Sequence, residues 1–179
     1  MWKIAKQFDF CYGHRVWSQT LNPEFSLDSC LKCRHLHGHQ GTLNVFLEAD
    51  HLQDGMVTDF KHLNWLKKWL DDVLDHKFIM DANDPAFPLF FPGLRNNLIT
   101  VDIDGKNFYQ IPDPKILEYL VSPMNEIYEG LVFVHFVPTS ENLSKWIFDI
   151  VQEKMSRINI KVSGVQFFET PKSQSNYIL

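Results

Sequence analysis

The sequence predicts an α+β fold, with strands near both ends of the chain and two amphipathic helices between them. Apolar residues alternate with polar ones near both ends, whereas two internal segments repeat apolar residues at helical spacing. Strands and helices do not alternate regularly, so βαβ units are not expected. At 179 residues, the chain is expected to form a single domain over residues 1–179.

Two strands are expected before the first helix. Apolar residues fall mostly at alternate positions over residues 2–11, and residues 43–49 (LNVFLEA) alternate again. Between them, residues 18–34 contain an Asn-Pro step, serines and two cysteines, which predicts a long loop. Asp54-Gly55 then predicts a turn.

Two helices are expected because apolar residues recur there at steps of three and four, which places them on one helical face. The first face contains Leu63, Leu66, Leu70, Val73 and Leu74, and the second contains Leu143, Trp146, Ile147, Ile150 and Val151. Thr58 or Asp59 is a suitable N-cap for the first helix, and Thr139 or Ser140 for the second.

The residues between the two helices, about 82–137, are less regular. The run NDPAFPLFFPG (83–93) contains three prolines and is expected to interrupt regular structure. Residues 98–111 predict a hairpin that turns at Asp104-Gly105 or Gly105-Lys106. A short helix is expected after Pro114, and the apolar run LVFVHFV (131–137) predicts a buried strand.

The C-terminal part of the chain returns to strand. Residues 158–170 (INIKVSGVQFFET) alternate, with a break at Gly164, and a short segment at residues 176–179 ends the sequence.

Composition narrows the possible functions. The net charge is −5 and no basic block occurs, so nucleic acid is not expected as a partner. The first ten residues lack the apolar run of a signal peptide, and LVFVHFV is too short to span a membrane. Three cysteines, an odd number, favour free thiols in a reduced, cytoplasmic protein.

The stretch CRHLHGHQ (33–40) indicates a metal site. On a strand, His37 and His39 point to the same face, and His35 points away. His14 ends the first strand, so an antiparallel pairing of the first two strands brings it to the same end of the sheet. Three neutral imidazoles are the pattern of a catalytic zinc ion with one open position. The competing interpretation is that these are structural histidines.

A second zinc site is possible within the same stretch. Cys30 and Cys33, followed by His37 and His39, form a closed set of four ligands in a structural zinc knuckle. The two halves are closer in sequence than is usual for such sites. In this interpretation the chain is a non-catalytic module.

Six short motifs, in order, resemble the 6-pyruvoyl-tetrahydropterin synthase family. They are FDFCYGH, CRHLHGH, GMVTDF, LDH, PTSEN and FFET, and they lie within about residues 1–81 and 138–179. The Cys-x3-His-Gly-His spacing is most similar to the bacterial 6-carboxytetrahydropterin synthase branch, which serves the synthesis of queuosine and other 7-deazapurines. The resemblance implies the tunnelling fold: an antiparallel sheet with two helices on one face, and subunits that assemble into a barrel, usually a homohexamer.

The resemblance also implies a substrate, a reaction and a metal site. The substrate is 7,8-dihydroneopterin triphosphate, and the products are 6-carboxy-5,6,7,8-tetrahydropterin, acetaldehyde and triphosphate. The nearest alternative, a 6-pyruvoyl-tetrahydropterin synthase, eliminates triphosphate but keeps the side chain. Zinc is bound by His14, His37 and His39 in this resemblance.

The remaining roles follow from the same motifs. Cys33 matches a catalytic thiol, and Asp75 and His76 match a proton relay in which the carboxylate orients the imidazole. Glu169 matches the pterin anchor, and Thr139 and Ser140 match positions that also hold the pterin ring. The competing interpretations are charged residues at a helix end for Asp75 and His76, a solvent-facing strand end for Glu169, and helix capping for the hydroxyls.

The sequence departs from the family pattern at three places. Gln40-Gly41 replaces a polar-plus-aromatic pair, and Tyr12-Gly13 stands where small residues are usual. Residues 82–137 form a large insertion, for which a lid, triphosphate recognition or an oligomer contact are possible roles. Arg95 and Lys106 are the insertion's candidate anion ligands, and solvated surface charge is the simpler interpretation.

Overall fold

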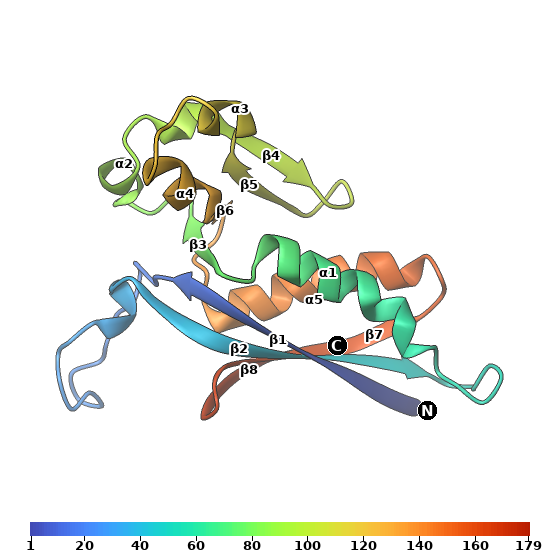
Figure 1. Cartoon of the computed structure of the whole chain (residues 1–179). Coiled ribbons are helices and arrows are strands. Elements are labelled where there is room, and N and C mark those ends of the chain that lie inside the picture. Colours follow the sequence, from blue (N-terminus) through green and yellow to red (C-terminus); the bar gives the residue numbers. More distant parts are fainter.

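The computed structural model describes all 179 residues as one mixed sheet with two long helices and a smaller set of short ones (Figure 1). The strands are β1 (Trp2–His14), β2 (His37–Ala49), β3 (Lys77–Asp81), β4 (Leu98–Asp102), β5 (Phe108–Pro112), β6 (Leu131–Val134), β7 (Lys161–Thr170) and β8 (Ser173–Ile178). The helices are α1 (Asn64–Val73), α2 (Phe87–Phe90), α3 (Pro114–Leu117), α4 (Met124–Glu129) and α5 (Ser140–Ser156). Short 3-10 helices span Lys32–Arg34, Phe60–Leu63 and Leu94–Asn97.

The eight strands are hydrogen-bonded in the order β4-β5-β6-β3-β1-β2-β7-β8. The α+β class is confirmed, and β1, β2, β7 and β8 pair antiparallel as expected. β3 pairs in parallel with both β1 and β6, so the whole sheet is mixed rather than antiparallel. The sequence did not predict β3, because this five-residue strand is mostly buried and carries no polar–apolar alternation.

Helices α1 and α5 cover one face of β1, β2, β7 and β8 (Figure 1). The main core between them takes alternate residues of each strand, including Phe8, Phe10, Leu43, Val45, Val165 and Phe167. Both predicted helices form, and the caps are Asp59, before the 3-10 turn that leads into α1, and Thr139, before α5. Each side chain accepts a hydrogen bond from a backbone N–H in the first turn.

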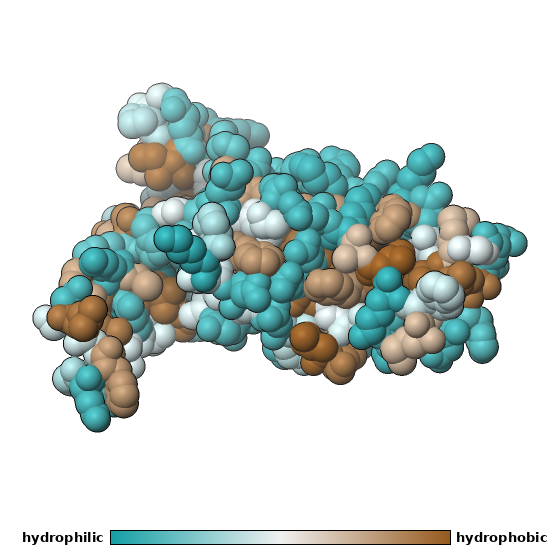
Figure 2. Space-filling model, turned by 90° about the horizontal axis from the view of Figure 1, so that it is seen from below, coloured by the Kyte–Doolittle hydropathy of each residue, from teal (hydrophilic) through white to brown (hydrophobic).

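The opposite face of this sheet is not covered by a helix, and its side chains are largely polar (Figure 2). Gln7, Asn44, Gln166 and Asn176 lie opposite one another on four neighbouring strands. The amide of Asn44 donates to Gln166 Oε1 at 3.0 Å. Burial therefore determines the alternation in these strands: apolar residues face the helices, and polar residues face solvent.

The segment between α1 and α5 extends the same sheet. The predicted hairpin forms β4 and β5, and the predicted buried strand forms β6. Val132 and Val134 point into the main core, whereas Leu131 and Phe133 point into a second core with Met80, Ala82, Phe87, Leu94 and Tyr128. One helical turn, α2, lies within the proline-rich run where no regular structure was expected.

In Figure 1 the β4–β5 hairpin lies above α1, with the main sheet below the helix. Tyr109 and Ile111 of β5 pack against the main core, and Lys106 Nζ lies 3.5 Å from Glu153 Oε2 of α5. No helix is long and apolar enough to cross a membrane.

Candidate functional site

Three histidine side chains converge where β1 ends and β2 begins. The antiparallel register places His14 opposite His37 and Tyr12 opposite His39, so all three imidazoles lie on the helix-covered face. One ligand nitrogen from each histidine lies within 4.8 Å of the others. His14 Nε2 and His37 Nε2 are 3.1 Å apart. His35 lies outside this group, as expected from its position in the alternation.

Backbone carbonyls determine which nitrogen each ring presents. His14 Nδ1 lies 2.6 Å from the carbonyl oxygen of Pro138, and His37 Nδ1 lies 2.8 Å from that of His35. A carbonyl only accepts, so each Nδ1 carries the proton and each Nε2 presents a lone pair. The third nitrogen, His39 Nε2, is buried without a hydrogen-bond partner. Two lone pairs and an unpartnered ring nitrogen that face one another would be satisfied together by one cation.

Burial keeps the imidazoles of His14 and His39 neutral. It lowers the pKa of His14, which is fully buried, to about 4, although the Pro138 carbonyl partly opposes this shift. Burial, and to a smaller extent the charge of His37, also lower the pKa of His39. Neutral imidazole is the form that binds metals, so the donor set fits a zinc ion with three nitrogen ligands.

Glu169, near the end of β7, also reaches this group. Its Oε1 lies 3.4 Å from His14 Nε2 and 3.7 Å from His39 Nε2. Burial raises the pKa of the Glu169 carboxyl, and the charge of His37 partly opposes this. The structure thus brings the predicted pterin anchor to the three histidines rather than to a solvent-facing strand end.

The long loop after β1 returns Cys33 to the same region. Val16, two residues after His14, donates its backbone N–H to the Cys33 carbonyl at 2.6 Å. The backbone N–H of Cys33 in turn donates to Gln19 Oε1 at 3.0 Å. Burial and the charge of Glu169 raise the pKa of the half-buried thiol. Without a cation nearby, Cys33 is therefore protonated near neutral pH.

Thr139 and Ser140 lie at the start of α5, directly after Pro138. Thr139 Oγ1 accepts from the backbone N–H of Asn142 at 3.3 Å, and is the N-cap. The Ser140 hydroxyl is 3.3 Å from Glu141 Oε2. The Pro138 carbonyl contacts His14, so the next two residues, Thr139 and Ser140, start α5 close to the histidine group.

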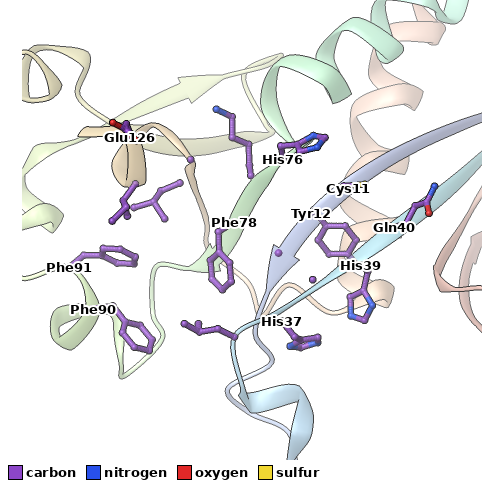
Figure 3. Close-up of a pocket in the computed structure, with 17 residues that line it drawn as sticks. Cys11, Tyr12, His37, His39, Gln40, His76, Phe78, Phe90, Phe91 and Glu126 are labelled. Atoms are coloured by element: carbon purple, nitrogen blue, oxygen red, sulfur yellow. The ribbon is translucent and has the colours of Figure 1, made fainter. Parts of the chain in front are cut away.

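Asp75 and His76 form the expected pair, but not beside the three histidines. Asp75 Oδ2 lies 2.8 Å from His76 Nδ1, and Asp75 Oδ1 accepts from the backbone N–H of Cys11 at 2.7 Å. His76 is on the β3 side of β1, whereas His37 and His39 are on the β2 side (Figure 3). The His76 side chain is 80% exposed, so within one chain it is available to a molecule that approaches from outside.

His76 borders a cavity of about 960 Å³ between the ends of β1 and β2 and the segment after β3 (Figure 3). Its walls are largely apolar and include Phe78, Phe90, Phe91 and Ile127. The same cavity is bordered by β1 and β2, including His37 and His39. Sequence reasoning missed the walls that β3, α2 and α4 add, because those elements carry no metal or catalytic motif. The aromatic run at residues 87–91 was the available signal.

The structure does not assemble the alternative zinc knuckle. The metal-competent group consists of His14, His37 and His39, and it includes neither Cys30 nor Cys33. Cys30 is exposed on the loop. The grouping therefore favours the open three-histidine site over a closed structural one.

Neither candidate anion ligand of the insertion points into this site. Arg95 donates to the Ala82 carbonyl at 2.6 Å and lies over the Phe87 ring, at 4.6 Å from its centroid. Lys106 is exposed beside Glu153. Arg95 thus has a packing role in the second core, and Lys106 is a surface charge.

Comparison with known proteins identifies the family. Residues 3–178 match the model of the 6-pyruvoyl tetrahydropterin synthase family. The chain belongs to this family. A 6-carboxy-5,6,7,8-tetrahydropterin synthase from Aquifex aeolicus is 31% identical over 188 residues, which cover 98% of this chain and 97% of the relative. Family membership makes the chain an enzyme of the lyase class.

Solved structures agree with this assignment at the level of the fold. An uncharacterized protein from Wolinella succinogenes superposes with a TM-score of 0.93 at 50% identity, over 99% of this chain and 97% of that one. A 6-pyruvoyltetrahydropterin synthase from Plasmodium vivax has a TM-score of 0.54 at 17% identity, over 98% and 95% of the two chains, and shows the shared fold alone.

One departure from the family pattern lies inside the site. Tyr12 is only 3% exposed. The centroid of its ring lies 5.1 Å from that of His14 and 5.7 Å from that of His39. The Tyr12 hydroxyl is buried and has no hydrogen-bond partner. Burial and the charge of Glu169 raise the pKa of this phenol, so the hydroxyl remains a donor.

Proposed function

We propose that the chain is a zinc-dependent 6-carboxytetrahydropterin synthase. It converts 7,8-dihydroneopterin triphosphate to 6-carboxy-5,6,7,8-tetrahydropterin, acetaldehyde and triphosphate, as a step in queuosine biosynthesis. The observation that carries the proposal is the convergence of three histidine nitrogens, with His14 and His37 each held by a backbone carbonyl. The relatives named as 6-carboxytetrahydropterin synthases support this choice of product.

His14, His37 and His39 hold the metal in this proposal. A zinc ion there lowers the pKa of bound substrate hydroxyls and makes the adjacent C–H protons easier to remove. The carbonyls of Pro138 and His35 keep the His14 and His37 rings in the correct tautomer. Glu169 accepts two N–H hydrogen bonds from the pterin, and Thr139 and Ser140 contact the ring from the start of α5.

Cys33 is the proposed base that takes a proton from the substrate side chain. Backbone hydrogen bonds hold Cys33 beside Val16, which is two residues after His14. This places the proposed base in the same region as the histidine group. Its raised pKa works against thiolate formation, and a nearby divalent cation works in favour of it. His76, oriented by Asp75, is the proposed proton relay.

A second subunit completes the proton relay in this proposal. Since His76 is exposed and lies across β1 from the three histidines, we propose that a neighbouring subunit of a homohexamer receives it. Mixing two inactive variants tests this arrangement. Cys33→Ala and His76→Ala subunits, dissociated and reassembled together, should regain activity, and each variant reassembled alone should not. A mixture that stays inactive, although native mass spectrometry shows mixed oligomers, would contradict the shared site.

The product is tested with purified, zinc-loaded protein and 7,8-dihydroneopterin triphosphate. We expect acetaldehyde and triphosphate to form in equal amounts, with a Cys33→Ala variant as the control that keeps zinc but loses turnover. Triphosphate without acetaldehyde would reject the carboxy product and favour a 6-pyruvoyl-tetrahydropterin synthase. An active Cys33→Ala variant would remove the thiol from the mechanism.

A further inference from the structure

The ring of Tyr12 occupies a place that Gly41 leaves open. A Cβ atom at position 41 would lie 3.2 Å from Tyr12 Cε1 and 3.0 Å from Phe167 Cε2, which is tighter than ordinary contact. Any side chain at position 41 would therefore require the rings of Tyr12 and Phe167 to shift. The two departures from the family pattern are therefore linked. Tyr12 on β1 supplies an aromatic ring, and Gly41 on β2 lacks the aromatic side chain that is usual there.

The Tyr12 ring and Glu169 lie on the same face of the sheet. Thr42 pairs with Phe168, so Glu169 is the next β7 residue beyond the ladder, on the Gly41 side. The Tyr12 ring leans across Gly41 to within 5.7 Å of the Phe167 ring, measured between centroids. Phe167 and Glu169, two apart on one strand, point to the same face. No side chain of residue 41 separates the phenol from the carboxylate.

The hydroxyl group itself needs an explanation. A buried hydroxyl without a partner costs about 1 to 3 kcal/mol, and a phenylalanine would fill the same space without that cost. Tyr12 OH is inaccessible to water and has no partner, while the Glu169 carboxylate points at His14 and His39. Because His14 presents a lone pair at Nε2, it gives Glu169 no hydrogen bond, and the carboxylate needs a donor from another residue.

We propose that Tyr12 is a positioning residue for the pterin: its hydroxyl donates a hydrogen bond to the Glu169 carboxylate and fixes the orientation in which Glu169 accepts the pterin N–H groups. This inference rests on the proposed function, because it assigns the pterin to Glu169. Tyr12 acts through Glu169 and is not itself a group that reacts. The arrangement depends on both Tyr12 and Gly41, so the pair determines how tightly this site holds its ligand.

The test uses zinc-loaded protein, with unphosphorylated neopterin as a fluorescent probe. In Tyr12→Phe, the ring stays and only the hydroxyl is lost. We expect unchanged zinc content, and in the metal-stripped protein, where the hydroxyl has no partner, a Tm that is equal or higher. Neopterin should bind about tenfold more weakly, in line with the loss of a hydrogen bond to a charged group. Equal neopterin affinity, or loss of zinc, in Tyr12→Phe would overturn the proposal.

Two further variants separate positioning from packing. Tyr12→Phe should add almost nothing to the weakening of neopterin binding that Glu169→Gln already causes, since the two groups act as one unit. Fully additive effects would overturn the proposal.

A ring-transfer variant tests the packing role. Tyr12→Ala should lower the Tm, and Tyr12→Ala/Gly41→Phe should restore it by returning a ring to the same space. The double variant should still bind neopterin as weakly as Tyr12→Phe, and tight binding would count against the hydroxyl.

Failure of this inference is distinguishable from failure of the proposed function. If wild-type protein binds neopterin and Tyr12→Phe weakens that binding, the inference stands even where no acetaldehyde is released. If wild-type protein produces acetaldehyde and Tyr12→Phe changes neither binding nor turnover, the inference falls and the proposed function stands. Wild-type protein that binds no neopterin overturns the inference, whereas release of acetaldehyde from the triphosphate substrate alone decides the proposed function.

Discussion

At the scale of single residues, hydrogen bonds to Nδ1 determine what the histidines can do. The carbonyls of Pro138 and His35 fix the protons on His14 and His37, and the unpartnered Nε2 of His39 completes the group. A cation is the partner that satisfies all three nitrogens at once. The candidate metal site therefore depends on the hydrogen-bonding needs of the ring nitrogens as well as on strand register.

The two zinc hypotheses differ in which residue the metal needs. His14→Ala should reduce bound zinc to a small fraction of the wild-type amount, because it removes one of three ligands. Cys30→Ala should leave the zinc content unchanged, since this exposed thiol lies outside the group. Atomic absorption on the two purified variants measures both. The reverse result, with zinc lost only in Cys30→Ala, would support the closed knuckle.

Protonation of His14 should make the metal-stripped protein sensitive to acid. Burial lowers the pKa of folded His14 to about 4, against 6.5 for the free side chain. Between these values the unfolded state binds more protons, so the free energy of unfolding decreases as the pH falls from 6.5 towards 4. The contribution is roughly 2 to 4 kcal/mol, at about 1.4 kcal/mol per pKa unit.

Urea unfolding of metal-stripped protein at pH 7.5 and pH 5 measures this effect. A His14→Leu variant is the matched control, because it keeps an apolar group of similar size but cannot be protonated. The wild-type protein should lose more stability than His14→Leu over this interval. Equal losses in the two proteins would mean that His14 is not held neutral by its surroundings.

Much of the site was predictable from the sequence at this scale, and the reason is periodicity. Because strand side chains alternate, His37 and His39 had to share a face, and His14 at the end of the neighbouring strand had to meet them. The approach of Glu169 to these rings depends on the position of β7, which spacing alone does not give. The role we propose for Tyr12 depends on the missing side chain at Gly41, a packing fact that only the structure shows.

At the scale of elements, the start of α5 connects the core to the site. The Pro138 carbonyl holds His14, and the next residue, Thr139, caps the helix. The apolar face of α5 then packs on β7 and β8. A change at this helix end should therefore affect both the stability of the protein and the geometry of the histidines.

Thr139→Ala should lower the free energy of unfolding by about 1 kcal/mol through loss of the cap, and it should also weaken neopterin binding. Thr139→Ser is the matched control, since serine keeps the capping hydroxyl. Chemical denaturation and neopterin fluorescence measure the two effects. A Thr139→Ala variant with unchanged stability would show that the hydroxyl does not support the helix.

Helices were easier to predict than the short strands. α1 and α5 carry long apolar faces and capping residues, and both helices form where the spacing indicates. β3 was missed because its mostly buried residues carry no polar–apolar alternation, and α2 because its four residues lie in the proline-rich run. The parallel pairing of β3 with β1 follows from the chain path after α1, which no local pattern encodes.

At the scale of the whole molecule, one sheet joins two apolar cores. β6 is buried on both faces, with Val132 and Val134 in the main core and Leu131 and Phe133 in the second. The segment between α1 and α5 is thus part of the folded unit and supplies walls of the cavity beside His76. We infer that unfolding of the second core disturbs the site through β3 and β1.

Phe133→Ala should cost about 3 to 5 kcal/mol, because a fully buried aromatic side chain is removed from the second core. The control is Phe108→Ala, at a ring on β5 that is 41% exposed, where a much smaller loss is expected. Denaturation followed by fluorescence should show one transition for each variant, because a single sheet runs through both cores. Two separated transitions in Phe133→Ala would indicate that the cores unfold independently.

The central claim is that three imidazoles from β1 and β2 bind one metal ion with a position left open for substrate. Anomalous diffraction at the zinc absorption edge, from crystals of the active protein, tests it most directly. The account predicts one strong peak about 2.0–2.1 Å from the Nε2 atoms of His14, His37 and His39, with no bond to Cys30. A peak between Cys30 and Cys33, or active crystals without a peak at the three histidines, would contradict it.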